Sequence, residues 1–357
     1  LAATRDMALI RDFADTMRQE WTSIGLRGMY GYMADLATEP RWYRVHETFT
    51  EDADLAANIM KTLLEHLQGG PLNPKSPVAL TMKHFPGGGP QELGLDPHYA
   101  FGKNQVYPAG NFGWHLKPWK AAIDAGASSI MPYYGVPIDV TYEGVTYEQT
   151  GMAFSKQIVT DLLRGKLGFK GYVNSDTGII NDRAWGLEGK TVPERVAAAI
   201  NGGTETLSGF NDVKTITDLV GAGLLSEARV TEAAKRLLEP MFKLGLFENP
   251  YVDEGLATAA VGAAASRTIG LDAERKSIVL LQNRDSGGGK VLPLASTARV
   301  YTMGIDSADA SRYVVAVTNG ETNASGVALP RDAAGNVVGR PSAAGFDRAV
   351  IRVEVGN

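Results

Sequence analysis

Apolar and polar positions along residues 50–246 repeat with two different periods. After Thr50, a residue that can cap a helix start, aliphatic side chains return at every fourth position and form one apolar helix face. This face consists of Leu55, Ile59, Leu63 and Leu67. The next apolar run, residues 78–82, predicts a buried strand.

The same alternation continues to about residue 244. It predicts helices over 117–126, 154–168, 193–201 and 226–244, and strands over 128–135, 171–176 and 205–209. Apolar strands that alternate with helices are typical of a parallel α/β sheet, and helices on one outer layer close such a sheet into a barrel. We therefore expect a TIM-type (β/α) barrel over residues 1–245.

A change of composition marks the end of this first region. The stretch 246–268 is rich in Pro, Gly and Ala and interrupts the alternation, so we interpret it as a linker. Apolar runs then suggest strands within 277–283, 299–304 and 349–355, whereas 318–347 has little periodicity and predicts loop. We expect residues 269–357 to form a second, incomplete α/β sandwich domain.

Polar side chains follow three of the predicted strands at the point where each strand ends. These positions are Lys83 and His84, Tyr133 and Tyr134, and Ser175 and Asp176. Parallel α/β folds hold their sites at the carboxyl ends of the strands. A carboxylate such as Asp176 can act there as a nucleophile, a general base, a metal ligand or a structural cap.

Composition narrows the function classes. The chain has 357 residues and a net charge of −5, so its charge gives no sign of nucleic-acid binding. It has no cysteine, which excludes thiolate metal ligands and a cysteine nucleophile. His46, His66 and His115 show no metal-ligand spacing, and we expect neither metal nor cofactor. No apolar run is long enough for a membrane span, and the first residues lack a signal-peptide pattern. The chain does not begin with Met, and the compartment stays open between a reducing and an oxidising one.

The segment VALTMKHFPGGGP, residues 78–90, places two cationic side chains before a glycine-rich loop. Consecutive side chains of a regular strand point to opposite faces, so Lys83 and His84 reach one ligand only if the backbone is irregular, for instance through a cis peptide. A phosphate loop is the alternative interpretation. It lacks the Lys-Ser/Thr pair of a P-loop, and no helix start follows it.

Five segments, in order, resemble glycoside hydrolase family 3, the β-glucosidases and related exo-acting enzymes. They are EPRWYRVHETFTED, KHFPGGG, AAIDAGASSIMPYYG, LGFKGYVNSD and RKSIVLLQN. The resemblance covers essentially the whole chain. Family members have βα units ahead of the first residues of this sequence, so we expect a barrel without its first βα units. The location is not determined by the sequence, and a periplasmic or secreted one is favoured over the cytoplasm.

The resemblance implies roles for individual residues. Asp176 matches the nucleophile that forms a covalent glycosyl-enzyme, and Lys83, His84 and Arg44 match residues that bind hydroxyls of the innermost sugar. The cationic side chains would also stabilise an ionised Asp176. Further residues that match the sugar pocket or its ligand loop are Met131, Tyr134, Asp96 and His98.

The sequence departs from the family pattern at two places. Thr177 follows the nucleophile where the family has Trp, and Arg183 and Trp185 are candidates for the missing wall. The acid/base is usually a Glu of the second domain; Glu354 is the candidate here, although Val353 stands where a Gly is expected. The alternative is an acid from a second subunit of a homodimer or from a further part of the same polypeptide.

The expected function is that of a retaining exo-acting β-glucosidase. Its substrate would be a β-linked oligosaccharide or an aryl β-glucoside. β-Xylosidase and β-N-acetylglucosaminidase activities remain alternatives within the family, and so does a non-catalytic carbohydrate-binding homologue. The acetylglucosaminidase type uses a His–Asp pair on a loop after a barrel strand as its acid/base; a linker and a second-domain strand argue against it here.

Overall fold

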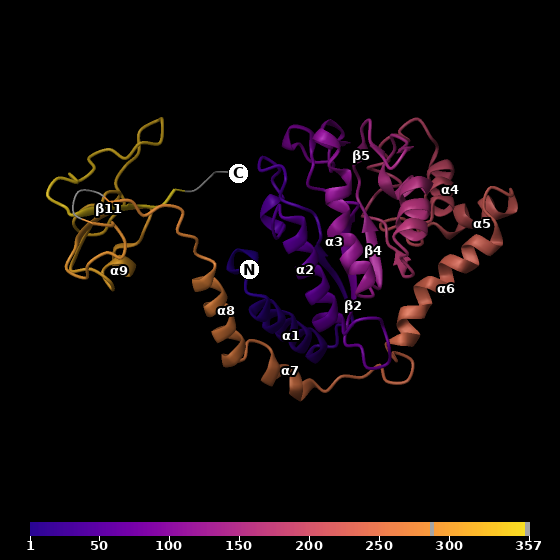
Figure 1. The fold of residues 1–357 in the computed structure, drawn as a ribbon, viewed down its shortest axis with the longest axis horizontal. Coiled ribbons are helices and arrows are strands. Elements are labelled where there is room, and N and C mark those ends of the chain that lie inside the picture. The colour runs from indigo at the N-terminus through magenta and orange to yellow at the C-terminus, as the bar shows by residue number, and fades with distance from the viewer. Residues whose placement is uncertain (286–288, 354–357) are drawn as a thin grey trace. The chain divides into compact units, whose positions relative to one another are not determined.

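The computed structural model describes residues 1–285 and 289–353. A four-stranded parallel sheet with the strand order β1-β2-β4-β8 forms the centre of residues 1–278, and helices alternate with its strands (Figure 1). The elements up to the last of these strands are α1 (Met7–Ser23), β1 (Gly28–Met33), α2 (Ala53–Leu63), β2 (Ala79–Phe85), β3 (Asn104–Gln105), α3 (Phe112–Asp124), β4 (Ser129–Pro132), β5 (Val136–Pro137), β6 (Thr141–Tyr142), β7 (Val145–Thr146), a π-helix (Gln157–Lys166) and β8 (Tyr172–Val173). They are followed by α4 (Val192–Gly202), α5 (Val213–Gly221), α6 (Glu227–Lys243), α7 (Glu254–Ala260) and α8 (Ala264–Lys276).

Helix α2 shows how local sequence produces the alternation. Its apolar face is buried as expected, since Ile59 and Leu63 are fully shielded from solvent. Its cap differs from the expectation: the side chain of Asp52 accepts hydrogen bonds from the backbone N–H groups of Asp54 and Leu55. Thr50 lies too early in the chain to cap this helix, and its hydroxyl accepts from the N–H of Asp52 instead.

The sheet is strongly curved. Strands β1 and β8 are its two outer strands, yet Nδ2 of Asn174, directly after β8, donates a 2.7 Å hydrogen bond to the hydroxyl of Tyr30 in β1. Strands three positions apart in a flat sheet lie roughly 14 Å from each other, which is farther than these two side chains can span. The fold of this region is therefore TIM-like, with helices outside a curved parallel sheet.

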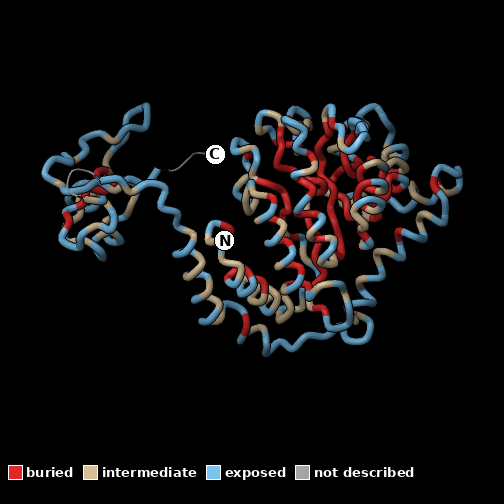
Figure 2. The backbone as a smooth tube through the Cα atoms, viewed as in Figure 1, coloured by how far each residue is buried: buried red, intermediate tan, exposed pale blue. Residues whose placement is uncertain are grey.

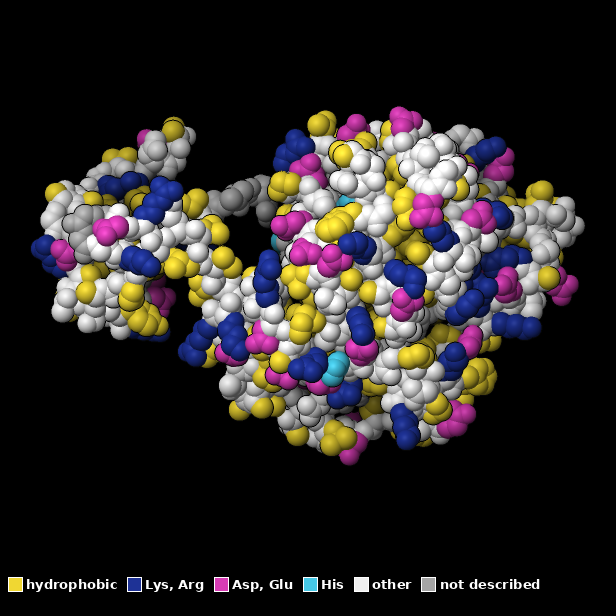
Figure 3. All heavy atoms as spheres, in the orientation of Figure 1, with side chains coloured by type: hydrophobic (Ala, Val, Ile, Leu, Met, Phe, Trp, Pro, Cys, Tyr) yellow, Lys and Arg dark blue, Asp and Glu magenta, His cyan; other side chains and the backbone are white. Residues whose placement is uncertain are grey.

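The hydrophobic core lies between the sheet and its helices, and the strands of this region are largely buried (Figure 2). Trp119 of α3 packs edge-to-face against Phe85 of β2, with ring centroids 5.3 Å apart. On the face seen in Figure 3, acidic and basic side chains are interspersed over the surface of this region. No helix among the described residues is long and apolar enough to cross a membrane.

The region interpreted as a linker is partly helical. Helices α7 and α8 both contact α1, and the chain divides into two compact units between Ile278 and Val279, about ten residues later than the sequence suggested. The predicted strand over 277–283 is not formed: residues 278–281 have no regular secondary structure and are exposed, with Leu281 92% accessible.

The second unit, residues 279–357, contains a small parallel sheet with the order β10-β9-β11. Its elements are β9 (Arg299–Met303), α9 (Ser307–Ala310), β10 (Ala316–Asn319) and β11 (Arg348–Ile351). Strand β9 lies in the predicted run 299–304, and β11 overlaps the beginning of the predicted run 349–355. The segment between β10 and β11 is mostly loop, as its composition predicted.

Candidate active site

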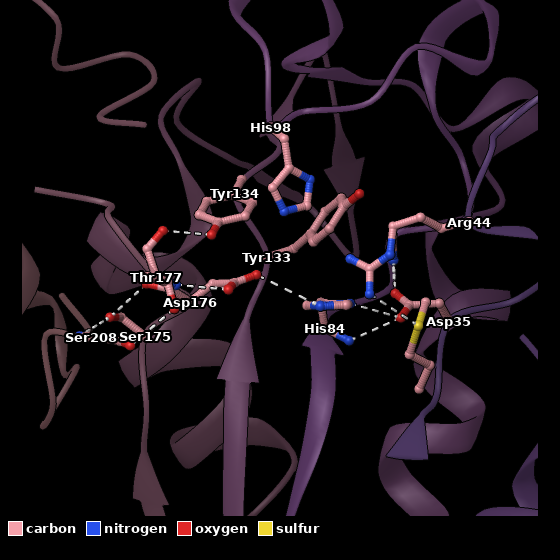
Figure 4. A network of polar contacts seen from close by, with 12 residues as sticks. Asp35, Arg44, His84, His98, Tyr133, Tyr134, Ser175, Asp176, Thr177 and Ser208 are labelled. Atoms are coloured by element: carbon pink, nitrogen blue, oxygen red, sulfur yellow. Dashed lines mark hydrogen bonds and ion pairs between the residues drawn. The ribbon is translucent and has the colours of Figure 1, made fainter. Parts of the chain in front are cut away.

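The carboxyl ends of the parallel strands bring together side chains from four segments that are far apart in the sequence (Figure 4). Asp35 follows β1, His84 lies in β2, Tyr133 and Tyr134 follow β4, and Asp176 follows β8. This is the end of the sheet at which polar residues were expected to converge. The structure thus brings together His84, Tyr133 with Tyr134, and Ser175 with Asp176 from the three predicted strand ends.

Asp176 lies at the open side of this cluster. Its side chain is 14% exposed, and its Oδ2 lies 3.6 Å from Nε2 of His84. Its Oδ1 accepts a 2.7 Å hydrogen bond from the backbone N–H of Thr177. The carboxylate is therefore fixed through one oxygen while the other faces His84.

Tyr134 and Arg183 both contact the carbonyl of Thr177, the residue after Asp176. The Tyr134 hydroxyl donates a 2.6 Å hydrogen bond to the carbonyl of Thr177, and the guanidinium of Arg183 lies over the Tyr134 ring, 5.3 Å from its centroid. Burial, together with the charge of Asp176, raises the pKa of Tyr134 well above its usual value of 10. Tyr134 therefore remains a neutral hydrogen-bond donor across the physiological range.

His84 is held from the opposite side by Asp35. Oδ2 of Asp35 accepts hydrogen bonds from both the backbone N–H of His84, at 3.1 Å, and its Nδ1, at 3.0 Å. The ring of Tyr133 covers the imidazole, with centroids 5.0 Å apart. The Asp35 carboxylate thus holds His84 through two hydrogen bonds on the side away from Asp176. The sequence analysis did not select this residue.

The backbone at Lys83 and His84 is irregular, as expected for a pair that serves one site. Their peptide bond is cis, and the pairing of β2 with β4 shifts register between Lys83 and Phe85. Lys83 is half-buried and lies opposite Met131 of β4 and Met33 of β1 in the sheet register.

Arg44 reaches the cluster from the loop after β1. Its guanidinium forms a two-point ion pair with Glu47, with Nε–Oε1 at 2.9 Å and a second nitrogen to Oε2 at 2.8 Å. Burial alone would lower the pKa of Arg44, but the pair with Glu47 raises it above its usual value. Arg44 also lowers the pKa of Glu47, and the charge of nearby Lys83 acts in the same direction. Glu47 is a second residue of this cluster that the sequence analysis did not select.

Asp96 and His98 form a separate pair on the loop after β2. Nδ1 of His98 lies 2.5 Å from Oδ1 of Asp96, while the indole N–H of Trp42 donates a 2.7 Å bond to Oδ2. Burial alone would raise the pKa of Asp96, but these hydrogen bonds keep it below its usual value. The imidazole of His98 stands edge-on to the Tyr134 ring at 5.0 Å, which connects this pair to the surroundings of Asp176.

The remaining predicted residues have different surroundings. Met131 is buried in β4, and Trp185 is 8% exposed with its indole N–H donating 2.7 Å to the carbonyl of Pro97. Trp185 therefore supports the loop that carries Asp96 and His98 and does not form an open platform. Glu354 lies outside the described residues. Among the residues that the structure describes, no three acidic, histidine or cysteine side chains group as a metal site.

Known proteins resemble this chain in sequence and in fold. Residues 1–239 match the family model described as "Glycosyl hydrolase family 3 N terminal domain". The chain belongs to glycosyl hydrolase family 3. The match includes every predicted site residue except Glu354, and it confirms the resemblance found in the sequence motifs.

Several relatives of this family 3 chain are β-glucosidases by name. Beta-glucosidase C of Emericella nidulans is 42% identical over 339 residues, which are 90% of this chain and 53% of the relative. A periplasmic beta-glucosidase/beta-xylosidase of Dickeya chrysanthemi is 36% identical over 352 residues, covering 93% of this chain and 53% of the relative. The chain thus spans about half the length of these curated relatives.

Solved structures show the same fold. An exo-1,3/1,4-beta-glucanase from a Pseudoalteromonas species superposes with a TM-score of 0.71 at 26% identity, over 85% of this chain and 36% of that one. A beta-glucosidase from Listeria innocua, solved with isofagomine, gives a TM-score of 0.74 at 24% identity, over 90% of this chain and 47% of that one.

Proposed function

We propose that this family 3 chain acts in a retaining exo-β-glycosidase, a β-D-glucosidase that releases terminal β-D-glucose from the non-reducing end of oligosaccharides or aryl glucosides. The observation that carries the proposal is the position of Asp176. It is a largely shielded carboxylate at the carboxyl end of the sheet, tethered through Oδ1 and faced by His84 through Oδ2. Relatives named as β-glucosidases support the same substrate class.

Asp176 is the proposed nucleophile. Its Oδ2 would attack the anomeric carbon as the glycosidic bond breaks, which gives a covalent glycosyl-enzyme that water later hydrolyses. Because Oδ1 is held by the Thr177 N–H, the attacking oxygen has a defined direction. The Tyr134 hydroxyl lies beside the carboxylate as a neutral donor and fixes the Thr177 carbonyl on the same turn.

The cationic residues are proposed to bind the sugar. Lys83, His84 and Arg44 would hold hydroxyl groups through charge-assisted hydrogen bonds, which position the ring over Asp176. Glu47 occupies Nε and one terminal nitrogen of Arg44, and so leaves the other terminal nitrogen of the guanidinium for a sugar. Arg183, beside Tyr134, is the proposed replacement for the wall that Trp provides elsewhere in the family.

The proposal also concerns the source of the proton donor and the fold to which the sheet belongs. A carboxylic acid about 5 Å from the nucleophile is required for retaining hydrolysis. Glu354 stays the candidate from the second unit, with a second subunit or a further part of the polypeptide as the other sources. The four-stranded sheet is proposed to be part of a (β/α) barrel.

Covalent trapping tests the nucleophile. An activated 2-deoxy-2-fluoro-β-glucoside should add one fluoroglucosyl mass to the chain, on the peptide that contains Asp176, and Asp176→Ala should abolish both labelling and turnover of an aryl β-glucoside. Asp182→Ala is the matched control because Asp182 is an exposed carboxylate six residues further on. Turnover of Asp176→Ala within tenfold of the parent, or a label on another residue, would refute the assignment. Glucose binding without any label would support the non-catalytic, carbohydrate-binding alternative.

The Asp96–His98 pair favours a second candidate, the β-N-acetylglucosaminidase type, in which a His–Asp pair on a loop acts as the acid/base. Asp96 holds Nδ1 of His98 on the loop after β2, and the imidazole reaches the Tyr134 ring. Under this candidate, His98→Ala would lose about 10³-fold on substrates with a poor leaving group and little on dinitrophenyl glycosides. The parent chain would also turn over N-acetylglucosaminides faster than glucosides. Under the β-glucosidase proposal with Glu354 as the acid, Glu354→Gln should lose activity on substrates with a poor leaving group and little on dinitrophenyl glycosides. His98→Ala should then lose similar amounts on both kinds of substrate.

A further inference from the structure

Asp35 accepts three hydrogen bonds in the site, as many as Asp96 does, and no motif singles it out. Its side chain is fully buried at the end of β1. Oδ2 accepts from the backbone N–H of His84 at 3.1 Å and from Nδ1 of the same residue at 3.0 Å. Oδ1 accepts from the backbone N–H of Gly88, in the glycine loop that follows β2.

The contact with the imidazole determines which ring nitrogen carries hydrogen. Both oxygens of Asp35 already accept hydrogen bonds from backbone N–H groups, so Nδ1 of His84 is the donor in its contact with Oδ2. Nε2 is then the atom that faces Asp176, at 3.6 Å from its Oδ2. A chain of contacts runs from Asp35 through His84 to Asp176, and Figure 4 shows these three residues in that order.

The groups around the imidazole leave it little freedom to turn. The Tyr133 ring covers it at 5.0 Å, and Tyr133 is itself fixed by a 3.1 Å hydrogen bond from Gln91 to its hydroxyl. A side chain at Gly88 would not fit, because a Cβ there would lie 2.8 Å from Oδ1 of Asp35 and 3.0 Å from the Tyr133 ring. Asp35 therefore fixes both the imidazole and the loop that surrounds it.

We propose that Asp35 is a positioning residue, which acts through His84 by holding the hydrogen on Nδ1 and directing Nε2 toward the sugar hydroxyl and Asp176. The inference rests on the proposed function of the site. Its alternative is a purely structural role, in which Asp35 only anchors Gly88 and the glycine loop.

A double-mutant cycle separates these roles. Asp35→Asn is nearly isosteric but replaces one accepting oxygen with a donor. It should lower kcat/KM for an aryl β-glucoside by about 10- to 100-fold, by analogy with the partners that orient metal-binding histidines. In a His84→Ala background the same change should cost no more than about twofold, because the residue through which Asp35 acts is gone. A loss in that background as large as in the parent would show that Asp35 works through the loop, and would overturn the proposal.

A spectroscopic measurement makes the test independent of turnover. The chain has five histidines, so His84→Ala identifies the His84 ring nitrogens in a ¹⁵N-correlated spectrum of the full chain. We expect hydrogen on Nδ1 in the parent and its loss or transfer in Asp35→Asn. A parent ring without hydrogen on Nδ1 overturns the proposal even if Asp35→Asn does not fold, and an unchanged ring in a folded Asp35→Asn does so as well. If no β-glycoside is turned over, the proposed function fails while the ring nitrogens still decide the role of Asp35.

Discussion

At the scale of single residues, the ion pair between Arg44 and Glu47 couples sugar binding to a supporting carboxylate. Glu47→Gln removes the charge and one of the two accepting oxygens, so Arg44 loses its fixed orientation. We expect KM for an aryl β-glucoside to rise about tenfold while kcat changes less, because ground-state contacts are affected. Steady-state kinetics measure this. Glu39→Gln is the control, since Glu39 pairs in the same way with the more exposed Arg41 and should leave KM unchanged.

The ion pair between Arg44 and Glu47 should make the free energy of unfolding depend on pH. Arg44 lowers the pKa of Glu47 below the usual value of 4.5, so the folded state binds this proton less tightly than the unfolded state. The stabilisation is therefore complete above pH 4.5 and is lost as the pH falls through the lowered pKa. Glu47 is 37% exposed, which limits the effect on the free energy of unfolding to about 1 kcal/mol or less. Denaturant unfolding should show a gap between parent and Glu47→Gln at pH 7 that closes under acid conditions. A gap that widens in acid would contradict the pairing.

Tyr134 gives a third prediction at this scale. Tyr134→Phe removes the donor to the Thr177 carbonyl and the hydroxyl beside Asp176, and we expect kcat to fall about tenfold. Because burial and the charge of Asp176 raise the pKa of Tyr134 well above 10, its ionisation does not cause any loss of activity near pH 9. Parent and variant should show the same alkaline limb in a pH–rate profile. An alkaline limb that disappears in Tyr134→Phe would show that this hydroxyl titrates in that range.

The site residues at the strand ends could be predicted from the sequence, but the carboxylates that hold them in place could not. Lys83, His84 and Asp176 stand out because charged side chains end apolar runs, and the structure brings His84 and Asp176 within 3.6 Å. Asp35 follows an apolar stretch in the same way, but its partners are a backbone N–H and an imidazole 49 residues later. No local pattern reports such a pairing. Glu47 was hidden for a similar reason, since an i, i+3 carboxylate next to arginine is common on surfaces.

At the scale of elements, a buried ion cluster connects strands and helices of the first unit. The side chain of Glu205 is fully buried and accepts from Arg164 at 2.6 Å, from Arg229 at 3.1 Å and from Arg236 at 3.2 Å. It also accepts from the backbone N–H of Val173 in β8. One carboxylate thus joins the π-helix, β8 and α6.

Replacing this carboxylate should destabilise the first unit. Glu205→Gln leaves three guanidinium groups around a neutral side chain, and breaking a buried pair in this way costs about 3 kcal/mol or more. Glu232→Gln is the matched control, because Glu232 contacts Arg229 and Arg236 but is 48% exposed, and we expect it to cost less than about 1 kcal/mol. Urea unfolding of both variants measures the difference. Equal midpoints would mean that the cluster adds no stability.

The elements also show where periodicity is informative and where it is not. The apolar faces of α2 and α3 and the runs that became β2 and β4 follow directly from the sequence, since burial sets their spacing. The apolar run 277–283 has the composition of a strand, but a strand requires a paired neighbour, and residues 278–281 are exposed. Composition likewise suggested a linker where α7 and α8 form, because alanine favours helices as well as flexible segments.

At the scale of the whole molecule, the described residues of the candidate site all belong to one of the two units. All residues of the candidate site that the structure describes, from Asp35 to Trp185, lie in the first unit, and the described hydrophobic clusters lie there as well. We therefore expect a chain that ends at Ile278 to keep the sugar pocket and the nucleophile. It should bind glucose with a Kd within about threefold of the full chain, since no described contact of the pocket is removed.

Trapping on this shortened chain makes the expectation testable without knowledge of the proton donor. A dinitrophenolate leaves without protonation, so dinitrophenyl 2-deoxy-2-fluoro-β-glucoside should label Asp176 in residues 1–278 as it does in the full chain, as measured by intact mass and peptide mapping. The same chain with Asp176→Ala is the control for unspecific labelling, and circular dichroism together with a cooperative thermal transition must show that it is folded. Hydrolysis of an unactivated disaccharide should be lost if Glu354 supplies the proton and retained if His98 does. A folded shortened chain that neither binds glucose nor takes up the label would show that the second unit forms part of the sugar pocket itself.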